Sequence, residues 1–358
     1  MYENELKALK KAGRFRERKI FDSELIDFAS NDYLGFANNK KQFKKAYKAV
    51  KEYDTIASKA SMLVNGYHEI HEAFEKTLSS LNSFEKGLVV GSGFLANMAL
   101  IESLVRKKDM LFIDEQYHAS GMMATGLLGD RVVKFRHNDP NDLEEKLKQH
   151  TKGRRIIAVE GVYSMSGKLC HRDIFKVADR YGALLIVDEA HSSGVVGKKL
   201  LGVYEHYKIF PEDNHIKMGT LGKAYGSYGA YILASSEIIS FLENRGKPII
   251  YATAPSVFDT ALALMNIIEI ANNSKKYSKA IKERQAIVKE ASGAELNSLI
   301  FALPVPNNAQ TIRLQEALIS KGFLVGAIRQ PTVAEPILRI IPRLGSSTEA
   351  LRSLLSNF

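Results

Sequence analysis

Between about residues 69 and 235, short apolar runs alternate regularly with helical patterns. No other feature of the sequence limits the possible folds as strongly. Seven such runs occur, at 87–90, 110–113, 131–135, 155–161, 184–191, 215–221 and 229–234. This alternation predicts βα units and an α/β fold with a mostly parallel sheet. Continuously apolar runs such as LLIV at 184–187 indicate strands that helices cover on both faces.

The same pattern divides the chain into parts. We expect an N-terminal segment at 1–50, a large α/β domain at 51–255 and a small α+β domain at 291–358. One long connecting helix is predicted over 256–290, because apolar residues recur at helical spacing and no glycine or proline lies between Pro255 and Gly293. Strands of the small domain are expected within 298–305, 322–328 and 336–341, around a helix at 310–321.

The composition and the first residues of the chain indicate where the protein is located in the cell. No window approaches 18 consecutive apolar residues, and residues 1–19 lack the apolar stretch of a signal peptide, so we expect a cytoplasmic protein without a membrane span. Cys170 is the only cysteine, which excludes an internal disulfide, and it has no partner at metal-ligand spacing. We therefore expect no metal site and an inert thiol in a loop.

The net charge of +10 leaves nucleic acid, an acidic membrane surface and a polyanionic substrate open as partners. The basic residues are spread along the chain, with higher local density at 7–19 and 40–51. No arginine-rich tract is interleaved with aromatic residues, as a single-strand binder would show. A solvated basic surface is therefore favoured over nucleic-acid binding.

Polar residues follow several of the apolar runs, where ligands of open α/β sheets bind. A glycine turn, GSGFLAN at 91–97, leads into a helix and could hold a phosphate. Asp188 and His191 follow LLIV, and Lys223 stands in the glycine-rich stretch GTLGKAYGSYGAY at 219–231. The turn is neither G-x-G-x-x-G nor a Walker A sequence, which argues against nicotinamide and nucleoside triphosphate binding.

Each of these residues alone has an ordinary interpretation. A strand-end aspartate is more often a helix cap or part of a core ion pair, and most lysines are simply solvated. The combination matches pyridoxal 5′-phosphate, whose phosphate needs N–H and hydroxyl donors, whose ring nitrogen needs an acid and whose aldehyde needs an amine.

At this point the sequence resembles the α-oxoamine synthases, a group within the fold-type I pyridoxal-phosphate enzymes, over nearly the whole chain. The motifs that carry the resemblance are FASNDYLGF (28–36), GSGFLAN (91–97), YHAS (117–120), EGVYSMSG (160–167), VDEAHSSG (187–194), GTLGKAYGSYG (219–229), IYATA (250–254) and GAIRQPTV (326–333). The resemblance implies a fold-type I transferase with a large domain, a small C-terminal domain and a short N-terminal segment.

The resemblance also implies roles for individual residues. Lys223 would bind the cofactor aldehyde and later move the proton of the amino acid's α carbon, and Asp188 would keep the pyridine nitrogen protonated. His191 and Ser164 would lie near the phenolic oxygen, and His118 would stack on the ring. The remaining binding residues would be Gly93, Phe94 and Thr220 for the phosphate, Thr253 from the other subunit of a homodimer with shared sites, Asn31 and Arg339 for a carboxylate, and Arg16 for the acyl substrate.

The implied reaction is a decarboxylating condensation of L-alanine with a pimeloyl thioester carried by coenzyme A or acyl carrier protein, without nucleic-acid or membrane partners. A sister activity such as glycine C-acetyltransferase uses the same machinery and stays open. A rival of another class is a basic nucleic-acid-binding protein that kept this fold. The intact set of Lys223, Asp188, His191 and His118 argues against that rival, because a protein without turnover has no need of it.

Several positions depart from the family pattern. Residues 57–66 read ASKASMLVNG where relatives have a glycine-rich turn, and Ser166 stands where an aspartate is common. Gln330 interrupts an R-P-P-T sequence, and Ile337 replaces the first arginine of an R-x-R pair. The last difference bears on acyl-chain recognition more than on the chemistry.

Overall fold

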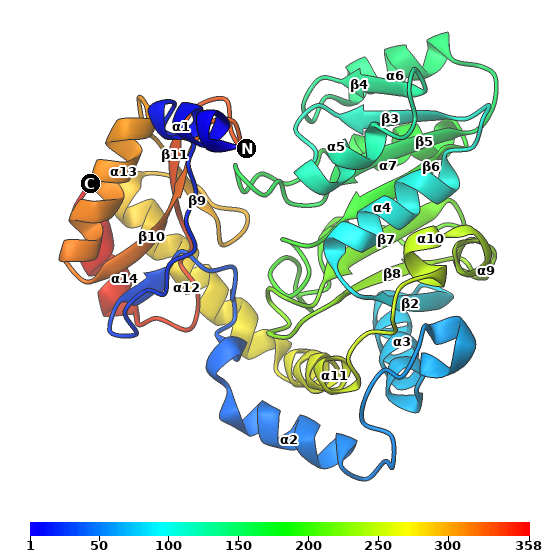
Figure 1. Ribbon diagram of the computed structural model, residues 1–358, viewed down its shortest axis with the longest axis horizontal. Helices are drawn as coiled ribbons and strands as arrows, with labels where there is room; N and C mark the ends of the chain where they lie inside the picture. The colour runs from blue at the N-terminus through cyan, green and yellow to red at the C-terminus, as the bar shows by residue number, and fades with distance from the viewer.

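The computed structural model describes residues 1–358 and contains two β-sheets (Figure 1). The larger sheet has seven strands: β2 Lys86–Val90, β3 Met110–Asp114, β4 Val132–Phe135, β5 Arg155–Glu160, β6 Leu184–Asp188, β7 His215–Thr220 and β8 Ala230–Ala234. Their order is β2-β8-β7-β6-β5-β3-β4, and only the pairs made by β8 are antiparallel. All seven predicted strands and the mostly parallel sheet are confirmed.

Helices cover both faces of this sheet, as the continuously apolar strands require. One face carries α4 Gly93–Leu104, α5 Ala119–Thr125, α9 Ser236–Arg245 and α10 Lys247–Ile250. The other carries α3 Glu69–Asn82, α6 Pro140–Gln149, α7 Asp173–Arg180 and α8 Val203–Tyr207. Strand β6 shows the reason, because Leu185 and Val187 join one apolar core and Ile186 joins the other.

The smaller sheet combines the two ends of the chain. Its strands are β1 Ile26–Phe28, β9 Phe301–Pro304, β10 Phe323–Ile328 and β11 Ile337–Ile340, in the order β1-β10-β11-β9. Helices α13 Asn308–Ser320 and α14 Thr348–Leu355 belong to the same region. The three C-terminal strands were predicted, whereas the parallel pairing of β1 with β10 was not. The domain boundaries predicted from the sequence remain a proposal. To the proposed small domain we add strand β1 from the N-terminal segment.

The prediction of one connecting helix over 256–290 is wrong. Two helices occupy the region, α11 Val257–Asn272 and α12 Ser274–Ser292, with a break at Asn273. Asn273 has non-helical backbone angles, and its side-chain amide donates to the backbone carbonyl of Glu269. Asparagine and serine side chains compete with the helical backbone for hydrogen bonds, so the sequence Asn272–Asn273–Ser274 ends one helix and begins another.

The N-terminal part contains the remaining elements: α1 Glu3–Lys11, the short helical turns η1 Phe36–Asn38 and η2 Met62–Gly66, and α2 Lys40–Val50. Helix α2 lies against α11, where Ala46 and Val50 pack on Val257 and Ala261 (Figure 1). None of the helices combines the length and the apolar character needed to cross a membrane.

Candidate active site

The candidate site lies at the carboxyl ends of β5, β6 and β7. Glu160 and Asp188 are register neighbours at the ends of β5 and β6, and Thr220 ends β7. Lys223 follows three residues after Thr220. Parallel strands bring their carboxyl ends to one edge of the sheet, so four polar residues from three separate motifs meet there.

Lys223 faces His191. Its Nζ lies 2.7 Å from Nε2 of the imidazole. Burial lowers the pKa of Lys223 from its usual 10.5 to about 8, although the negative charges of Asp188 and Glu160 oppose part of that effect. A substantial fraction of the amine is therefore neutral near physiological pH, which is the state that attacks a carbonyl group.

The loop that carries Lys223 is held in shape by its own backbone. The N–H of Gly226 donates to the carbonyl of Lys223 at 3.0 Å, and Ser227 donates to Leu221 at 2.9 Å. Gly226 has a φ of +56°, and a Cβ at this position would lie 2.3 Å from the Cβ of Phe36. Only glycine fits there, which explains one of the glycines around the lysine.

Asp188 is buried and held by two donors. Its Oδ2 accepts from Nδ2 of Asn97 at 3.0 Å, and its Oδ1 accepts from the backbone N–H of Ala190 at 3.0 Å. Asn97 lies on α4 and also donates to Ser120, while its Oδ1 accepts from the Tyr117 hydroxyl. Sequence reasoning missed Asn97, although it ends the GSGFLAN motif.

His118 joins the same network from the start of α5. Its Nδ1 lies 2.7 Å from the hydroxyl of Ser120, which itself accepts from Asn97. The histidine side chain is exposed to solvent at the edge of the site. The imidazole is therefore accessible to a ligand that binds beside Asp188.

His191 is buried between Lys223 and Tyr33. Its Nδ1 lies 2.6 Å from the Tyr33 hydroxyl. Burial lowers the pKa of His191 well below its ordinary value, and the positive charges of Lys223 and Arg339 lower it further. The neutral ring therefore has one donor and one acceptor nitrogen. Sequence reasoning did not single out Tyr33, although FASNDYLGF contains it.

Arg339 of β11 connects the two sheets at this site. Its Nη1 donates to Oδ1 of Asn31 at 2.9 Å, and its Nε donates to the backbone carbonyl of Ser164 at 2.8 Å. The predicted residues Asn31, Ser164 and Arg339 are therefore brought together, although they come from three distant parts of the chain. The buried guanidinium lies within 3.5 Å of the Tyr33 hydroxyl, which joins it to the His191 side of the site.

Gly93 and Phe94 begin α4, and Gly93 lies beside Thr220 at the end of β7. A Cβ on Gly93 would lie 3.8 Å from the Cβ of Thr220. Gly93 and Phe94 are the first residues of the helix, so their N–H groups have no carbonyl partner within it. Such a helix start, together with the Thr220 hydroxyl, suits a phosphate group.

Two predicted residues lie apart from this cluster. Thr253 is exposed beyond α10, and no hydrogen bond joins it to the other site residues within the chain. Arg16 donates to the Thr332 hydroxyl at 2.9 Å and lines a separate cavity of about 280 Å³ with Arg14 and Arg329. Their roles stay predictions.

Glu160 is a site residue that sequence reasoning missed. Its Oε2 accepts from the backbone N–H of Ser164 at 2.9 Å, whereas Oε1 is buried without a partner. Burial raises the pKa of Glu160 to about 8, and the charge of Asp188 contributes. Its place at a strand end, as the first residue of EGVYSMSG, was the available signal.

These residues fit pyridoxal phosphate. A helix start and the Thr220 hydroxyl suit its phosphate, the buried Asp188 suits a protonated ring nitrogen, and the Lys223 amine suits its aldehyde. The orphaned Oε1 of Glu160 is consistent with a site that is completed by a polar ligand.

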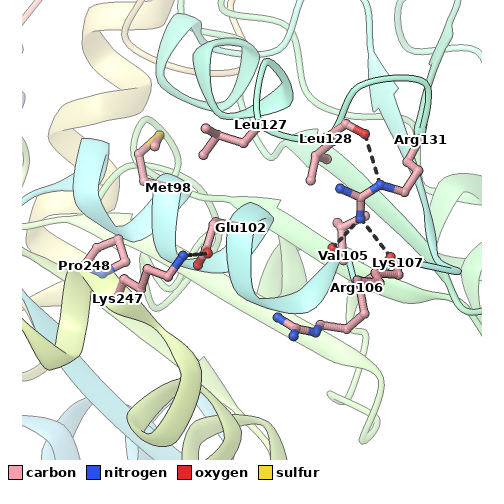
Figure 2. Close-up of a pocket in the computed structure, with 10 residues that line it drawn as sticks. All are labelled: Met98, Glu102, Val105, Arg106, Lys107, Leu127, Leu128, Arg131, Lys247 and Pro248. Atoms are coloured by element: carbon pink, nitrogen blue, oxygen red, sulfur yellow. Dashed lines mark hydrogen bonds and ion pairs between the residues drawn. The ribbon is translucent and has the colours of Figure 1, made fainter.

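A second cavity, of about 520 Å³, lies at the far end of α4 (Figure 2). Arg131 lines it, but its guanidinium donates to the backbone carbonyls of Leu128, Val105 and Arg106. The carboxylate of Glu102 is paired with Lys247 at 2.9 Å. The cavity contains no histidine and no free carboxylate, so it lacks the groups that the strand ends bring together.

Comparisons with known proteins agree with this geometry. The family model for aminotransferase class I and II matches residues 23–358. The 8-amino-7-oxononanoate synthase of Helicobacter pylori strain J99 is 42% identical over 99% of this chain and 95% of its own. The structure of an 8-amino-7-oxononanoate synthase from Francisella tularensis has a TM-score of 0.79 at 26% identity, covering 94% of this chain and 97% of its own.

A serine palmitoyltransferase from S. paucimobilis, solved with PLP and myriocin bound, has a similar fold. Its TM-score is 0.88 at 22% identity, and the match covers 99% of this chain and 96% of that one. At this identity the likeness establishes a shared fold.

Proposed function

The chain belongs to the class I and II aminotransferase family, and on that premise we propose that it catalyses the reaction of the 8-amino-7-oxononanoate synthases. It is then a pyridoxal-phosphate-dependent acyltransferase of biotin biosynthesis, which condenses L-alanine with a pimeloyl thioester and releases CO2. The observation that carries this proposal is the buried Lys223 amine beside His191 and Asp188, in a chain 42% identical to such an enzyme.

The chain's own side chains account for the proton and charge movements that the reaction needs. Bound pyridoxal phosphate would supply an electron sink for negative charge at the α carbon of the amino acid. Asp188 would hold the proton on the ring nitrogen, and Lys223 would take up the α proton at Nζ and later return a proton to the product. Burial keeps Lys223 in the required neutral state for part of the time at pH 7.

Arg339 and Asn31 would bind and orient the carboxylate of the incoming alanine. The guanidinium is already aligned by the Ser164 carbonyl and by Asn31 Oδ1, so little rearrangement is needed to exchange one partner for a carboxylate. His191 would donate or accept at Nε2 beside the phenolic oxygen, with Nδ1 held by Tyr33.

We infer a homodimer with shared sites from the surface around Thr253. Two hydrogen bonds join residues 58–60 to residues 254–255. The Ala254 N–H donates to the Ala60 carbonyl, and the Ser58 hydroxyl donates to the Pro255 carbonyl. Large apolar side chains a few residues from these joined segments are exposed, among them Val64 at 77% and Tyr251 at 80%. Exposed apolar side chains in this region support a subunit interface that includes Thr253.

The arginine cavity supports a carboxylate-bearing acyl substrate. Arg14, Arg16 and Arg329 line about 280 Å³ without an acidic residue, and Arg16 would then bind the acyl chain at its charged end. The sister activities remain the second candidate, because they share the Lys223 and Asp188 chemistry.

An absorbance scan tests the proposal. The protein reconstituted with pyridoxal phosphate is expected to show a visible band that L-alanine perturbs more strongly than glycine does, and a Lys223→Ala variant is expected to lose the band. Product analysis with pimeloyl thioester and alanine is expected to yield 8-amino-7-oxononanoate. A stronger response to glycine would favour a sister synthase. If no band forms and DNA binding falls steeply with salt, the protein is a nucleic-acid binder.

A further inference from the structure

Helix α2 presents an unusual surface. Residues 40–51 contain six lysines and no acidic residue. Two aromatic side chains on the same helix, Phe43 and Tyr47, are 54% and 58% exposed. We call the group Lys40, Lys41, Phe43, Lys44, Tyr47 and Lys48 the basic surface of α2.

The lysines in the basic surface of α2 are not needed to hold the helix in place. The helix is anchored by Ala46 and Val50, which are buried against α11, and by Phe43, whose ring lies 5.1 Å from that of Phe258 on α11. Phe43 and Tyr47 are four residues apart and therefore neighbours at the edge of this packed face, where each side chain is still more than half exposed. Among the lysines of the helix, only Lys45 has a carboxylate within ion-pair distance, Glu269 at 3.8 Å, so the lysines of the basic surface are free to meet a partner.

Helix α2 is separated from the candidate site by a single helix. Its neighbour α11 is bound to the Lys223 loop, because the Ser227 hydroxyl donates to the Asp259 carbonyl at 2.6 Å and Asn266 donates to the Tyr225 carbonyl at 2.8 Å. Lys40 also follows Asn31 by nine residues, which limits their separation to about 30 Å. Figure 1 shows α2 lying along α11 at the border of the molecule.

We propose that the basic surface of α2 docks an acidic protein that carries the acyl group as its thioester. This inference rests on the proposed function and names the carrier that the sequence left open. The outward side of a helix is convex, whereas small-molecule sites are concave, so a macromolecule fits it better than free coenzyme A. Complementary charge would steer an acidic carrier to this side of the enzyme, and Phe43 and Tyr47 would supply the apolar contact.

A membrane surface fits these observations less well. An amphipathic helix that lies in a membrane inserts its apolar face, and α11 already covers that face of α2. An acidic protein needs only a charged surface with a small apolar patch beside it, which is what α2 leaves exposed.

The test compares two thioesters of the same acyl group. A Lys40→Glu/Lys44→Glu/Lys48→Glu variant is assayed with pimeloyl acyl carrier protein and with pimeloyl coenzyme A. The KM for the carrier-bound thioester is expected to rise about tenfold or more at low salt, with kcat nearly unchanged. The KM for the coenzyme A thioester and for alanine is expected to stay as in the wild type.

A matched control is Lys275→Glu/Lys276→Glu/Lys279→Glu, which makes the same charge change with exposed lysines of α12. This control is expected to leave the carrier KM within about twofold, and a salt titration of the wild type is expected to weaken carrier use in the range where surface charges are screened. Thermal unfolding of both variants checks that they are folded.

An unchanged carrier KM in the α2 variant, with normal turnover, would overturn the docking proposal and leave the proposed function intact. Equal losses in the α2 and α12 variants would also overturn it, because net charge alone would then be the cause. Loss of binding to anionic vesicles or to DNA with unchanged carrier kinetics would assign α2 to another partner. No turnover of either thioester by the wild type would contradict the proposed function itself.

Discussion

The Tyr33 hydroxyl lies 2.6 Å from Nδ1 of His191, although 158 residues separate the two side chains in the sequence. Tyr33 is fully buried, and burial raises its pKa to about 12, so its hydroxyl keeps its proton at neutral pH. With Nδ1 engaged in this way, Nε2 is directed to Lys223. Tyr33 is therefore a positioning residue for His191.

Removing the hydroxyl tests this relationship. A Tyr33→Phe variant is expected to fold with a stability loss of about 1 kcal/mol and to lower kcat/KM by about tenfold, because His191 loses the bond that holds its ring. The pH dependence of the cofactor absorbance is expected to shift as well, which a purely structural role would not produce. An unchanged absorbance titration together with normal kinetics would contradict the assignment.

The pKa of Lys223 predicts a pH dependence for cofactor loading. The neutral amine reacts with an aldehyde, and burial has lowered the pKa of Lys223 to about 8. The loading rate of the apoprotein is expected to rise with pH and to level off above about pH 8, rather than above the usual value of 10.5. Stopped-flow absorbance after mixing with pyridoxal phosphate measures it, and a plateau only above pH 10 would contradict the assigned pKa.

The backbone of the Lys223 loop makes Gly226 sensitive to substitution. Gly226→Ala is expected to destabilise the protein by about 1 to 3 kcal/mol and to weaken cofactor binding, because φ is +56° and the new Cβ would meet Phe36. Gly182→Ala is the matched control, since Gly182 has a φ of +55° and open space around it. Equal effects of the two substitutions on cofactor affinity would show that contact with Phe36 is unimportant.

A buried ion pair beneath the His191 loop gives a stability prediction. Lys217 and Glu189 are both inaccessible to solvent, with Nζ and Oε1 3.7 Å apart, and the carboxylate also accepts from the Val203 N–H and the Ser192 hydroxyl. Lys217→Met is expected to cost about 3 to 5 kcal/mol, because it leaves the Glu189 charge unpaired. Adding Glu189→Gln is expected to recover a large part of that loss in urea unfolding, and a purely additive double variant would argue against coupling.

The shared site predicts complementation between two inactive subunits. Lys223→Ala and Thr253→Ala chains are each expected to be impaired. A mixed dimer would contain one site with both natural residues, since Thr253 is assigned to the site of the other subunit. Mixing under exchange conditions is expected to restore turnover above that of either parent, and its absence despite exchange of labelled subunits would place Thr253 outside the partner's site.

Much of the large sheet could be predicted from local patterns. The seven strands and the buried character of β6 follow from short apolar runs, because the period of side chains along a strand is a local property. Asp188 and Lys223 could be predicted for the same reason, since Asp188 ends β6 and Lys223 closely follows β7, at the edge where ligands of such sheets bind. The break at Asn273 was not predicted, because the apolar residues on both sides of it keep a helical spacing. The break depends on one side chain, the Asn273 amide, which donates to a carbonyl of the preceding turn.

The strands, the strand-end acid and lysine and the helix start for a phosphate could all be predicted from the sequence, because they depend on residues near one another in the chain. The folded chain was needed to reveal that β1 pairs with β10, that Arg339 reaches Asn31 and the Ser164 carbonyl, and that Tyr33 contacts His191. These contacts join segments of the chain that lie far apart. Local periodicity does not specify such pairings, because they form only when packed layers bring the two sheets together.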